Sequence, residues 1–255
     1  MSFDDAVLVA IAGVLAGAIN TAAGGGTLIT FPALLAVGLP PISANITSSL
    51  GLVPGYAGGA YAYRRELRGQ RRRFFALAAV SVIGGVLGAV LLLNTPAAAF
   101  KVAVPYLVTG SCLLLLVQPR LAAWVSVRRS RKGVDEGRVG LGARAAVLVA
   151  ATYGSYFGAG LGVLLLAVMG ILIPDDLQRL NGLKALLSCV VVTSGLVVYL
   201  LSGQASLPHV AILLVSSCVG GMLGGLLARK VSPTVLRRVV CTLGFGVASI
   251  LFIQG

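Results

Sequence analysis

Polar and small residues gather at two glycine-rich points of a chain that is otherwise strongly apolar. Glycine has no side chain, so its backbone N–H group can face a cavity directly, and Asn, Thr, Ser and Tyr add further donors. A helix that begins after such a break presents N–H groups with partial positive charge, which favour anions. These donors predict a binding site for a small anion. The candidate substrate-binding residues are Asn20, Gly24, Gly25, Gly26, Thr27, Asn45, Thr47, Ser48, Tyr156, Gly160, Gly162, Asn181 and Lys184.

Lys184 is the one candidate that carries a full charge, and it lies early in an apolar run. An ionisable residue within a membrane segment indicates a functional role. A lysine near the membrane surface can instead extend its ammonium group to water, and this alternative stays open. Lys101, at an expected helix start, is interpreted as an interfacial anchor.

Asn45 and Asn181 each precede a long apolar stretch. An asparagine in this place can cap the N-terminus of a helix. It can also contact a ligand, because a cap beside a break lies where a ligand would meet the backbone. Both interpretations are kept.

The residues that other chemistry would need are missing from the apolar runs. All seven acidic residues lie outside them, and the one histidine, His209, stands at an expected helix start. We therefore expect no carboxylate proton relay in the membrane and, without a paired nucleophile and base, no enzyme activity. The four cysteines stand singly without metal-binding spacing, so we expect packing residues and no metal or other cofactor.

The composition requires membrane helices to position these residues. Hydrophobic residues make up 58% of the 255 and charged residues 11%, whereas a soluble domain has about 25% charged residues. The apolar runs are 6–22, 26–39, 45–63, 74–93, 99–117, 145–160, 161–173, 183–201, 208–227 and 235–254. A crossing needs about 20 residues, so the second and seventh runs predict halves of broken or re-entrant helices. We expect an all-α, polytopic transmembrane helix bundle with eight or ten crossings.

The basic residues are concentrated between the apolar runs. The formal net charge is +13, and most Lys and Arg residues lie in 64–73, 118–144 and 228–238. Such clusters set membrane topology and mark the cytoplasmic side, so they do not indicate a nucleic-acid partner. We expect loops 64–73, 118–144 and 228–234 in the cytoplasm and both termini outside. The acidic start lacks the basic leader of a cleaved signal peptide, so the first run should remain as a helix.

The second part of the chain repeats the first at an offset of 136 residues. Gly24 coincides with Gly160, and Asn45 coincides with Asn181. The charge pattern gives the two copies opposite orientations, which is typical of secondary transporters whose substrate site lies between the repeats. Paired glycines at 84–88 and 220–224 predict close helix packing. The expected units are a first transmembrane repeat at 1–117, a basic cytoplasmic linker at 118–144 and a second, inverted transmembrane repeat at 145–255.

These motifs resemble the sulfite exporter TauE/SafE family of membrane transporters. The matching segments are 20–34 with 44–48, 153–162 with 181–184, and the Gly-Gly-x-x-Gly-Gly-x-x-Ala-Arg run at 220–229. The resemblance implies a permease or exporter of a sulfur-containing anion, such as sulfite, a sulfonate or thiosulfate, in the bacterial cell inner membrane. Similar sequences often have another asparagine about two turns after the lysine, where this chain has Val-Val-Thr-Ser at 191–194.

Two other functions stay open at this point. One is a channel-like uniporter of another small anion or a neutral solute, which a flux assay would separate from a carrier by its lack of saturation and trans-stimulation. The other is a non-transporting membrane assembly protein, which would not explain the paired glycine breaks. The expected partners are a small anionic substrate and the lipid bilayer, and the sequence leaves open whether identical chains form a homo-oligomer.

Overall fold

The computed structural model describes residues 2–22, 24–129, 139–173, 175–227 and 233–254. These residues form helices and no strands, which confirms the predicted all-α class. The helices are α1 (Phe3–Ala22), α2 (Thr27–Ala36), α3 (Pro41–Gly51), α4 (Val53–Ala62), α5 (Arg71–Asn94), α6 (Ala97–Arg129), α7 (Leu141–Tyr156), α8 (Leu161–Leu172), α9 (Leu177–Leu201), α10 (Leu207–Leu227) and α11 (Pro233–Gln254).

The two predicted glycine-rich breaks are present. The first separates α1 from α2, and the second separates α7 from α8. α2 has 10 residues and α8 has 12, which at 1.5 Å per residue gives lengths of about 15 and 18 Å. The hydrocarbon core of a bilayer is about 30 Å thick. Neither helix can cross it alone, as expected for half-helices.

The run at 45–63, expected as one crossing, is divided in the structure. α3 ends at Gly51 and α4 begins at Val53, followed by Pro54 near its N-terminus. Proline has no N–H group to continue the helical hydrogen bonds and clashes with the preceding turn, so a helix ends before it. α6 is longer than the expected run and makes part of the expected linker helical, up to Arg129. Residues 130–138 of that linker and 228–232 of the third basic loop lie outside the described residues.

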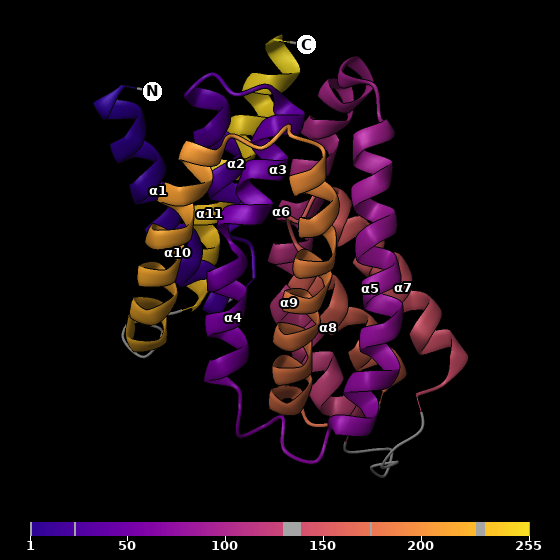
Figure 1. The fold of residues 1–255 in the computed structure, drawn as a ribbon. Helices are drawn as coiled ribbons and strands as arrows, with labels where there is room; N and C mark the ends of the chain where they lie inside the picture. The colour runs from indigo at the N-terminus through magenta and orange to yellow at the C-terminus, as the bar shows by residue number, and fades with distance from the viewer. Residues whose placement is uncertain (1, 23, 130–138, 174, 228–232, 255) are drawn as a thin grey trace.

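The helices form two bundles, which Figure 1 shows side by side. The first bundle contains α1–α4 and α10, with α1 packed along α10. The second bundle contains α5 and α7–α9, with α5 packed along α7 and α9. α6 and α11 pack against each other, and α4 contacts α9 between the bundles. Each bundle therefore takes one long helix from the other part of the sequence.

The arrangement has the symmetry expected of a repeated unit. The starts of α9, α10 and α11 follow those of α3, α5 and α6 at the 136-residue offset, as Leu207 follows Arg71. The pairing of α1 with α10 corresponds to the pairing of α7 with α5, and the α1–α2 contact corresponds to the α7–α8 contact. These pairs support the repeat, while the inversion of the two copies in a membrane stays a prediction.

The paired glycines lie where helices approach closely, which confirms their predicted packing role. A Cβ atom on Gly84 of α5 would lie 2.7 Å from the backbone oxygen of Leu148 in α7. A Cβ atom on Gly220 of α10 would overlap the backbone oxygen of Val14 in α1. Only a residue without a side chain permits these helix–helix distances.

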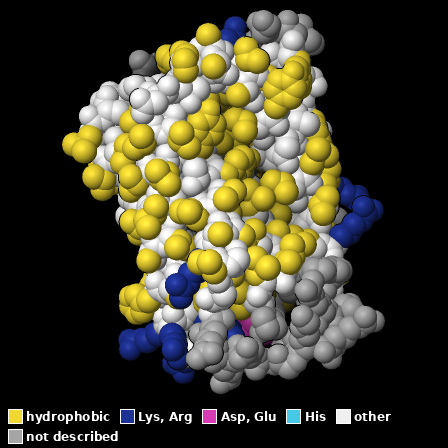
Figure 2. Space-filling model, turned by 90° about the vertical axis from the view of Figure 1, so that its right-hand side faces the viewer, with side chains coloured by type: hydrophobic (Ala, Val, Ile, Leu, Met, Phe, Trp, Pro, Cys, Tyr) yellow, Lys and Arg dark blue, Asp and Glu magenta, His cyan; other side chains and the backbone are white. Residues whose placement is uncertain are grey.

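The outer surface is that of a protein surrounded by lipid. Four helices of the described residues are long and apolar enough to cross a membrane, namely α1, α5, α6 and α9. Exposed leucine, isoleucine and valine side chains cover them, and Figure 2 shows hydrophobic side chains over most of one face, with basic ones mainly near its lower end. Both termini lie at the opposite end of the bundle from the loop that joins α4 to α5 (Figure 1). The chain is a multi-pass membrane protein.

Candidate functional site

The first glycine-rich break is held by the side chain of Asn20 in the last turns of α1. Its Oδ1 atom accepts hydrogen bonds from the backbone N–H groups of Gly25, at 3.2 Å, and Gly26, at 2.9 Å. Gly24 has a φ of +73°, a conformation that favours glycine. Asn20 thus accepts from two N–H groups just before α2, which the start of that helix leaves without helical acceptors.

The two breaks meet in the centre of the molecule. A Cβ atom on Gly24 would lie 3.5 Å from Cα of Gly162, in the first turn of α8. A Cβ atom on Gly162 would lie 3.6 Å from Cδ and 3.7 Å from Cε of Lys184 in α9. Gly160, at the second break, has a φ of +80° and precedes α8. The structure therefore brings together three of the candidate residues from both parts of the sequence.

Lys184 is buried, with 7% of its surface exposed. Among the described residues, no carboxylate and no hydrogen-bond acceptor contacts its ammonium group. A buried charge without a partner is strongly destabilising, because it has lost its hydration and gained nothing in return. Such burial argues against the alternative that Lys184 reaches water at the membrane surface.

The hydroxyl groups of the first repeat have different surroundings. Thr27 is buried, and a Cβ atom on Gly158 would lie 3.3 Å from its Oγ1 atom. Ser48 is buried and shares a hydrogen bond with Thr30. The Thr47 hydroxyl accepts a hydrogen bond of 3.0 Å from the N–H group of Ser206, so it faces the loop before α10. Thr27 is the candidate hydroxyl that lies at the meeting of the breaks.

The asparagine pair does not cap helices, so that alternative is wrong. The residue before α3 is Pro40 and the residue before α9 is Asp176, which accepts a hydrogen bond from the N–H group of Gln178. Asn45 lies within α3, is fully buried and donates a hydrogen bond of 2.8 Å to the backbone oxygen of Tyr156. Asn181 lies within α9. Their contact with a ligand stays a prediction.

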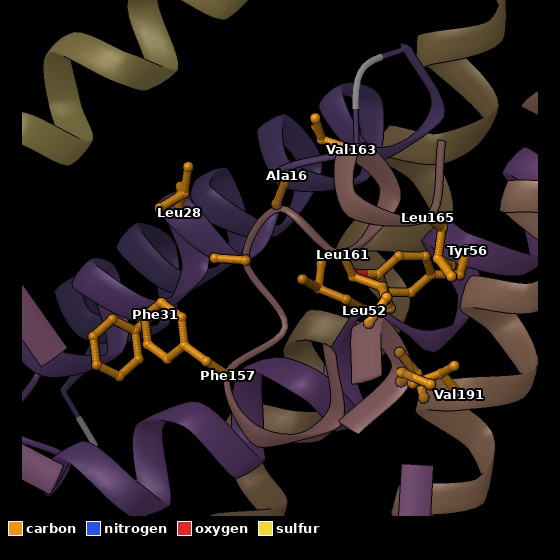
Figure 3. Packing of buried hydrophobic residues seen from close by; sticks show 14 of the residues in the cluster. Ala16, Leu28, Phe31, Leu52, Tyr56, Phe157, Leu161, Val163, Leu165 and Val191 are labelled. Carbon is orange, nitrogen blue, oxygen red and sulfur yellow. The ribbon is translucent and has the colours of Figure 1, made fainter. Parts of the chain in front are cut away.

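Tyr56 of α4 lies beside two of the candidate residues and was not itself among those predicted. Its side chain is 8% exposed, and its hydroxyl group interacts with the side chains of Thr27 and Asn20. Figure 3 shows its ring packed near Leu52, Leu161 and Leu165. A tyrosine that follows Pro54-Gly55 within an apolar run could have been noticed, because the polar end of a buried tyrosine needs a partner.

A buried ion pair at one end of the second bundle was also missed. Arg73 of α5 pairs with Asp175, and both side chains are buried. Arg179 of α9 lies 3.0 Å from the same carboxylate. Arg73 lies in the expected basic loop 64–73 and Asp175 lies outside the apolar runs, so nothing in the sequence indicated that the two are paired. Asp175 joins the start of α5 to the start of α9.

Buried polar groups of the first repeat and one buried cation of the second lie near the meeting of the two breaks. Asn20 uses its oxygen on the glycine N–H groups, and its Nδ2 atom has no hydrogen-bond partner although it is buried. Tyr56 and Thr27 add hydroxyl groups, and Lys184 adds a positive charge. Nearly all buried polar groups in proteins are paired. An anion that entered beside the two glycine breaks could accept hydrogen bonds from these groups and pair with the ammonium group.

Comparisons with known proteins agree with a transport role. The family model described as "Sulfite exporter TauE/SafE" matches residues 9–251. The chain is 25% identical over 248 residues to a Haemophilus influenzae protein named "Probable membrane transporter protein", covering 95% of this chain and 93% of that protein. It is 26% identical over 227 residues to the Escherichia coli K12 "Probable membrane transporter protein YfcA", covering 89% of this chain and 81% of that protein.

A third relative matches a shorter part of the chain. It is the "Probable membrane transporter protein ORF9" of a Sinorhizobium species, 32% identical over 111 residues. The match covers 44% of this chain and 42% of that protein. The names of all three relatives describe membrane transporters and do not include a substrate.

Proposed function

The chain belongs to the sulfite exporter TauE/SafE family, and from this premise we propose that it carries a small sulfur-containing oxyanion across the bacterial inner membrane. The family and its relatives indicate a transporter and not an enzyme. Sulfite, a sulfonate and thiosulfate are the substrates to compare. The substrate binds where the two glycine breaks meet, between the two bundles.

The observation that carries this proposal is the unpaired buried ammonium group of Lys184. In the described residues it has neither a carboxylate nor an acceptor beside it. A bound anion would supply the missing counter-charge and would be held by charge-assisted hydrogen bonds. A cation that served only to stabilise the fold would instead be expected to have a protein partner.

Transport follows from the arrangement of the repeats. The basic loops lie in the cytoplasm and both termini lie outside, so the two copies of the unit have opposite orientations. Rocking of one bundle against the other would then expose the site to each side in turn, as in other carriers with inverted repeats. Outward movement of an anion is favoured by the inside-negative membrane potential, by about 2.3 kcal/mol per charge per 100 mV.

Flux measurements in proteoliposomes test the proposal. Sulfite, thiosulfate and an alkyl sulfonate are compared for the unmodified protein, Lys184→Ala and Lys184→Arg. We expect Lys184→Ala to lose at least about tenfold in kcat/KM, because a charge-assisted hydrogen bond contributes about 1.5–3 kcal/mol, and Lys184→Arg to keep part of the activity.

Lys101→Ala is the matched control, because Lys101 is an exposed lysine near the start of α6. We expect its flux to stay within about twofold of the unmodified protein, since it loses only a hydrated surface charge. Flux that saturates and is stimulated from the opposite side indicates a carrier and excludes a channel. Undiminished transport by Lys184→Ala would remove Lys184 from the site.

A further inference from the structure

We infer that Asn20 and Tyr56 are the hydrogen-bond donors that hold the substrate against Lys184 and give the site its preference for oxyanions over halide ions. This inference rests on the proposed function and identifies which residues determine specificity. In it, the first repeat supplies the neutral donors and the second repeat supplies the charge, so that the anion bridges the two.

The orientation of the Asn20 amide is fixed by the backbone of the first break. Its Oδ1 atom accepts from Gly25 and Gly26, and only the oxygen of an amide can accept from N–H groups. Its NH₂ group must therefore point away from these two residues. The Nδ2 atom lies near α4, where a Cβ atom on Gly55 would be 3.7 Å from it. There it is buried and makes no hydrogen bond of good geometry, although the Asn20 side chain lies beside the Tyr56 hydroxyl group.

Tyr56 follows Gly55 and places its hydroxyl group at the same point. The hydroxyl interacts with the side chains of Asn20 and Thr27, and all three residues are buried. A hydroxyl group can rotate its hydrogen toward whichever acceptor is present. The hydrogen of the Tyr56 hydroxyl group can therefore rotate from its protein neighbours toward a bound anion and donate a hydrogen bond to it.

The position of Lys184 completes the arrangement from the other side. Its Cδ and Cε atoms lie beside Gly162, which in turn contacts Gly24. Ala185, the next residue of α9, faces Gly59 of α4, which lies about one turn after Tyr56, and a Cβ atom on Gly59 would lie 3.9 Å from Cβ of Ala185. α4, which carries Tyr56, and α9, which carries Lys184, are thus in contact at this level.

The corresponding residues of the other repeat cannot reproduce this set. At the 136-residue offset, Tyr56 corresponds to Val192 and Thr27 corresponds to Val163. Lys184 corresponds to Ser48. The valines have no polar atoms, and Tyr156, which corresponds to Asn20, has its hydroxyl group 3.3 Å from Oγ1 of Thr95. A site with donors on one repeat and charge on the other requires a ligand that contacts both.

An oxyanion fits these donors better than a halide ion does. Its separate oxygen atoms can each accept a hydrogen bond while another oxygen contacts the ammonium group. A halide is a single spherical acceptor without separate oxygen atoms, so donors spaced for the oxygens of a larger oxyanion would not all reach it at favourable distances. Loss of one of the neutral donors should therefore weaken oxyanion binding much more than halide binding.

The test compares sulfite and chloride as substrates of purified protein in proteoliposomes. Tyr56→Phe removes only the hydroxyl group, and we expect the KM for sulfite to rise about tenfold, as one charge-assisted hydrogen bond implies. Chloride flux should change by less than about twofold, so the preference for sulfite should fall. Tyr153→Phe is the matched control, because the Tyr153 hydroxyl is bonded to Ser111 and to the backbone oxygen of Ala159.

Asn20→Asp gives an independent readout. The carboxylate keeps an oxygen for the N–H groups of Gly25 and Gly26 but replaces the donor with a negatively charged oxygen, which would repel an anion. We expect a melting temperature close to that of the unmodified protein together with at least a tenfold loss of sulfite affinity, measured by sulfite-induced thermal stabilisation in detergent. Tyr56→Phe with unchanged sulfite KM and unchanged preference over chloride would overturn the inference.

Failure of the proposed function gives a different result. If Lys184→Ala transports sulfite normally, the proposed site is wrong. If Lys184→Ala loses sulfite transport as expected but Tyr56→Phe leaves the sulfite KM and the preference over chloride unchanged, only this inference is rejected. If the unmodified protein neither moves nor binds sulfite or chloride, both are rejected.

Discussion

Gly24 and Gly162 touch at the centre of the protein, although 138 positions of sequence numbering separate them in the chain (24 to 162). Each belongs to one of the two glycine breaks, and Lys184 packs against Gly162. The backbone of one repeat therefore lies directly on the backbone of the other beside the buried cation. Any side chain added here would enter the space between the breaks.

Substitutions of increasing size at Gly162 should show whether the contact between the breaks tolerates a methyl group and whether a larger side chain blocks transport. In Gly162→Ala the new Cβ atom would meet its neighbours at 3.6 Å or more, which is ordinary contact, so transport should be within about threefold of normal. In Gly162→Leu the longer side chain would displace Gly24 or Lys184, and transport should fall at least about tenfold. Proteoliposome flux and melting temperature are the measurements.

Gly110→Leu is the control for this series, because nothing lies within 4 Å of a Cβ atom on Gly110 of α6. Its flux should remain near normal. Equal losses in Gly110→Leu and Gly162→Leu would mean that leucine acts through general disruption and not through the central contact.

Cysteine labelling at Arg68 and Gln204 should reveal whether the repeats are inverted. These residues correspond at the 136-residue offset, both are exposed, and they lie in the loops before α5 and α10. In right-side-out vesicles of a variant lacking the four natural cysteines, an impermeant maleimide should label Gln204→Cys rapidly. It should label Arg68→Cys only after the membrane is permeabilised, because the positive charges predict that this loop is cytoplasmic. Labelling of both from one side would show parallel repeats.

The sequence was sufficient to predict the fold class and the elements around the breaks. Strong hydrophobic runs and glycine clusters are local signals, so the end of α1 falls near Gly24 and the start of α8 falls next to Gly160, as expected. Gly162 and Lys184 were both predicted to lie at the substrate site, because a buried charge and a broken helix each indicate the interface between the repeats.

The remaining features depend on contacts between distant parts of the chain. Tyr56 looks like any apolar-run tyrosine until the fold places its hydroxyl beside Asn20. Arg73 and Asp175 each stand at the edge of a run, and only the packing of α5 on α9 buries them together. The capping interpretation of Asn45 was wrong because α3 begins earlier, at Pro41, than the hydrophobic run suggested.

The glycine contacts between α5 and α7 should be sensitive to a single methyl group. A Cβ atom on Gly88 would overlap the backbone oxygen of Thr152, and backbone cannot move aside as a side chain can. Gly88→Ala should therefore lower the free energy of unfolding by about 1–3 kcal/mol, measured by thermal denaturation in detergent.

Gly58→Ala of α4 is the matched change, since nothing lies within 4 Å of a Cβ atom there. It should be neutral or stabilising by up to about 1 kcal/mol, because alanine favours the helix over glycine. A stable Gly88→Ala variant would show that α5 and α7 pack less closely than described.

The ion pair of Arg73 and Asp175 should matter for stability more than for substrate selection. Asp175→Asn removes the counter-charge of a buried guanidinium group, which should lower the free energy of unfolding by about 3 kcal/mol. Asp176→Asn should change it by less than about 0.5 kcal/mol, because Asp176 caps α9 and asparagine caps equally well. Thermal denaturation compares the two, and sulfite KM should be nearly normal in both.

A variant that lacks both charges shows why Asp175→Asn is less stable. The cause is either the loss of the attraction between the two charges or the burial of the Arg73 guanidinium group without its carboxylate. In Arg73→Met/Asp175→Leu no buried charge remains uncompensated, and replacing such a pair by apolar residues is often neutral or stabilising. We expect the double variant to recover most of the stability that Asp175→Asn loses. If the double variant is as unstable as the single one, the pair itself joins α5 to α9. If Asp175→Asn is as stable as Asp176→Asn, the Arg73 guanidinium is supported by its other neighbours and the carboxylate contributes little.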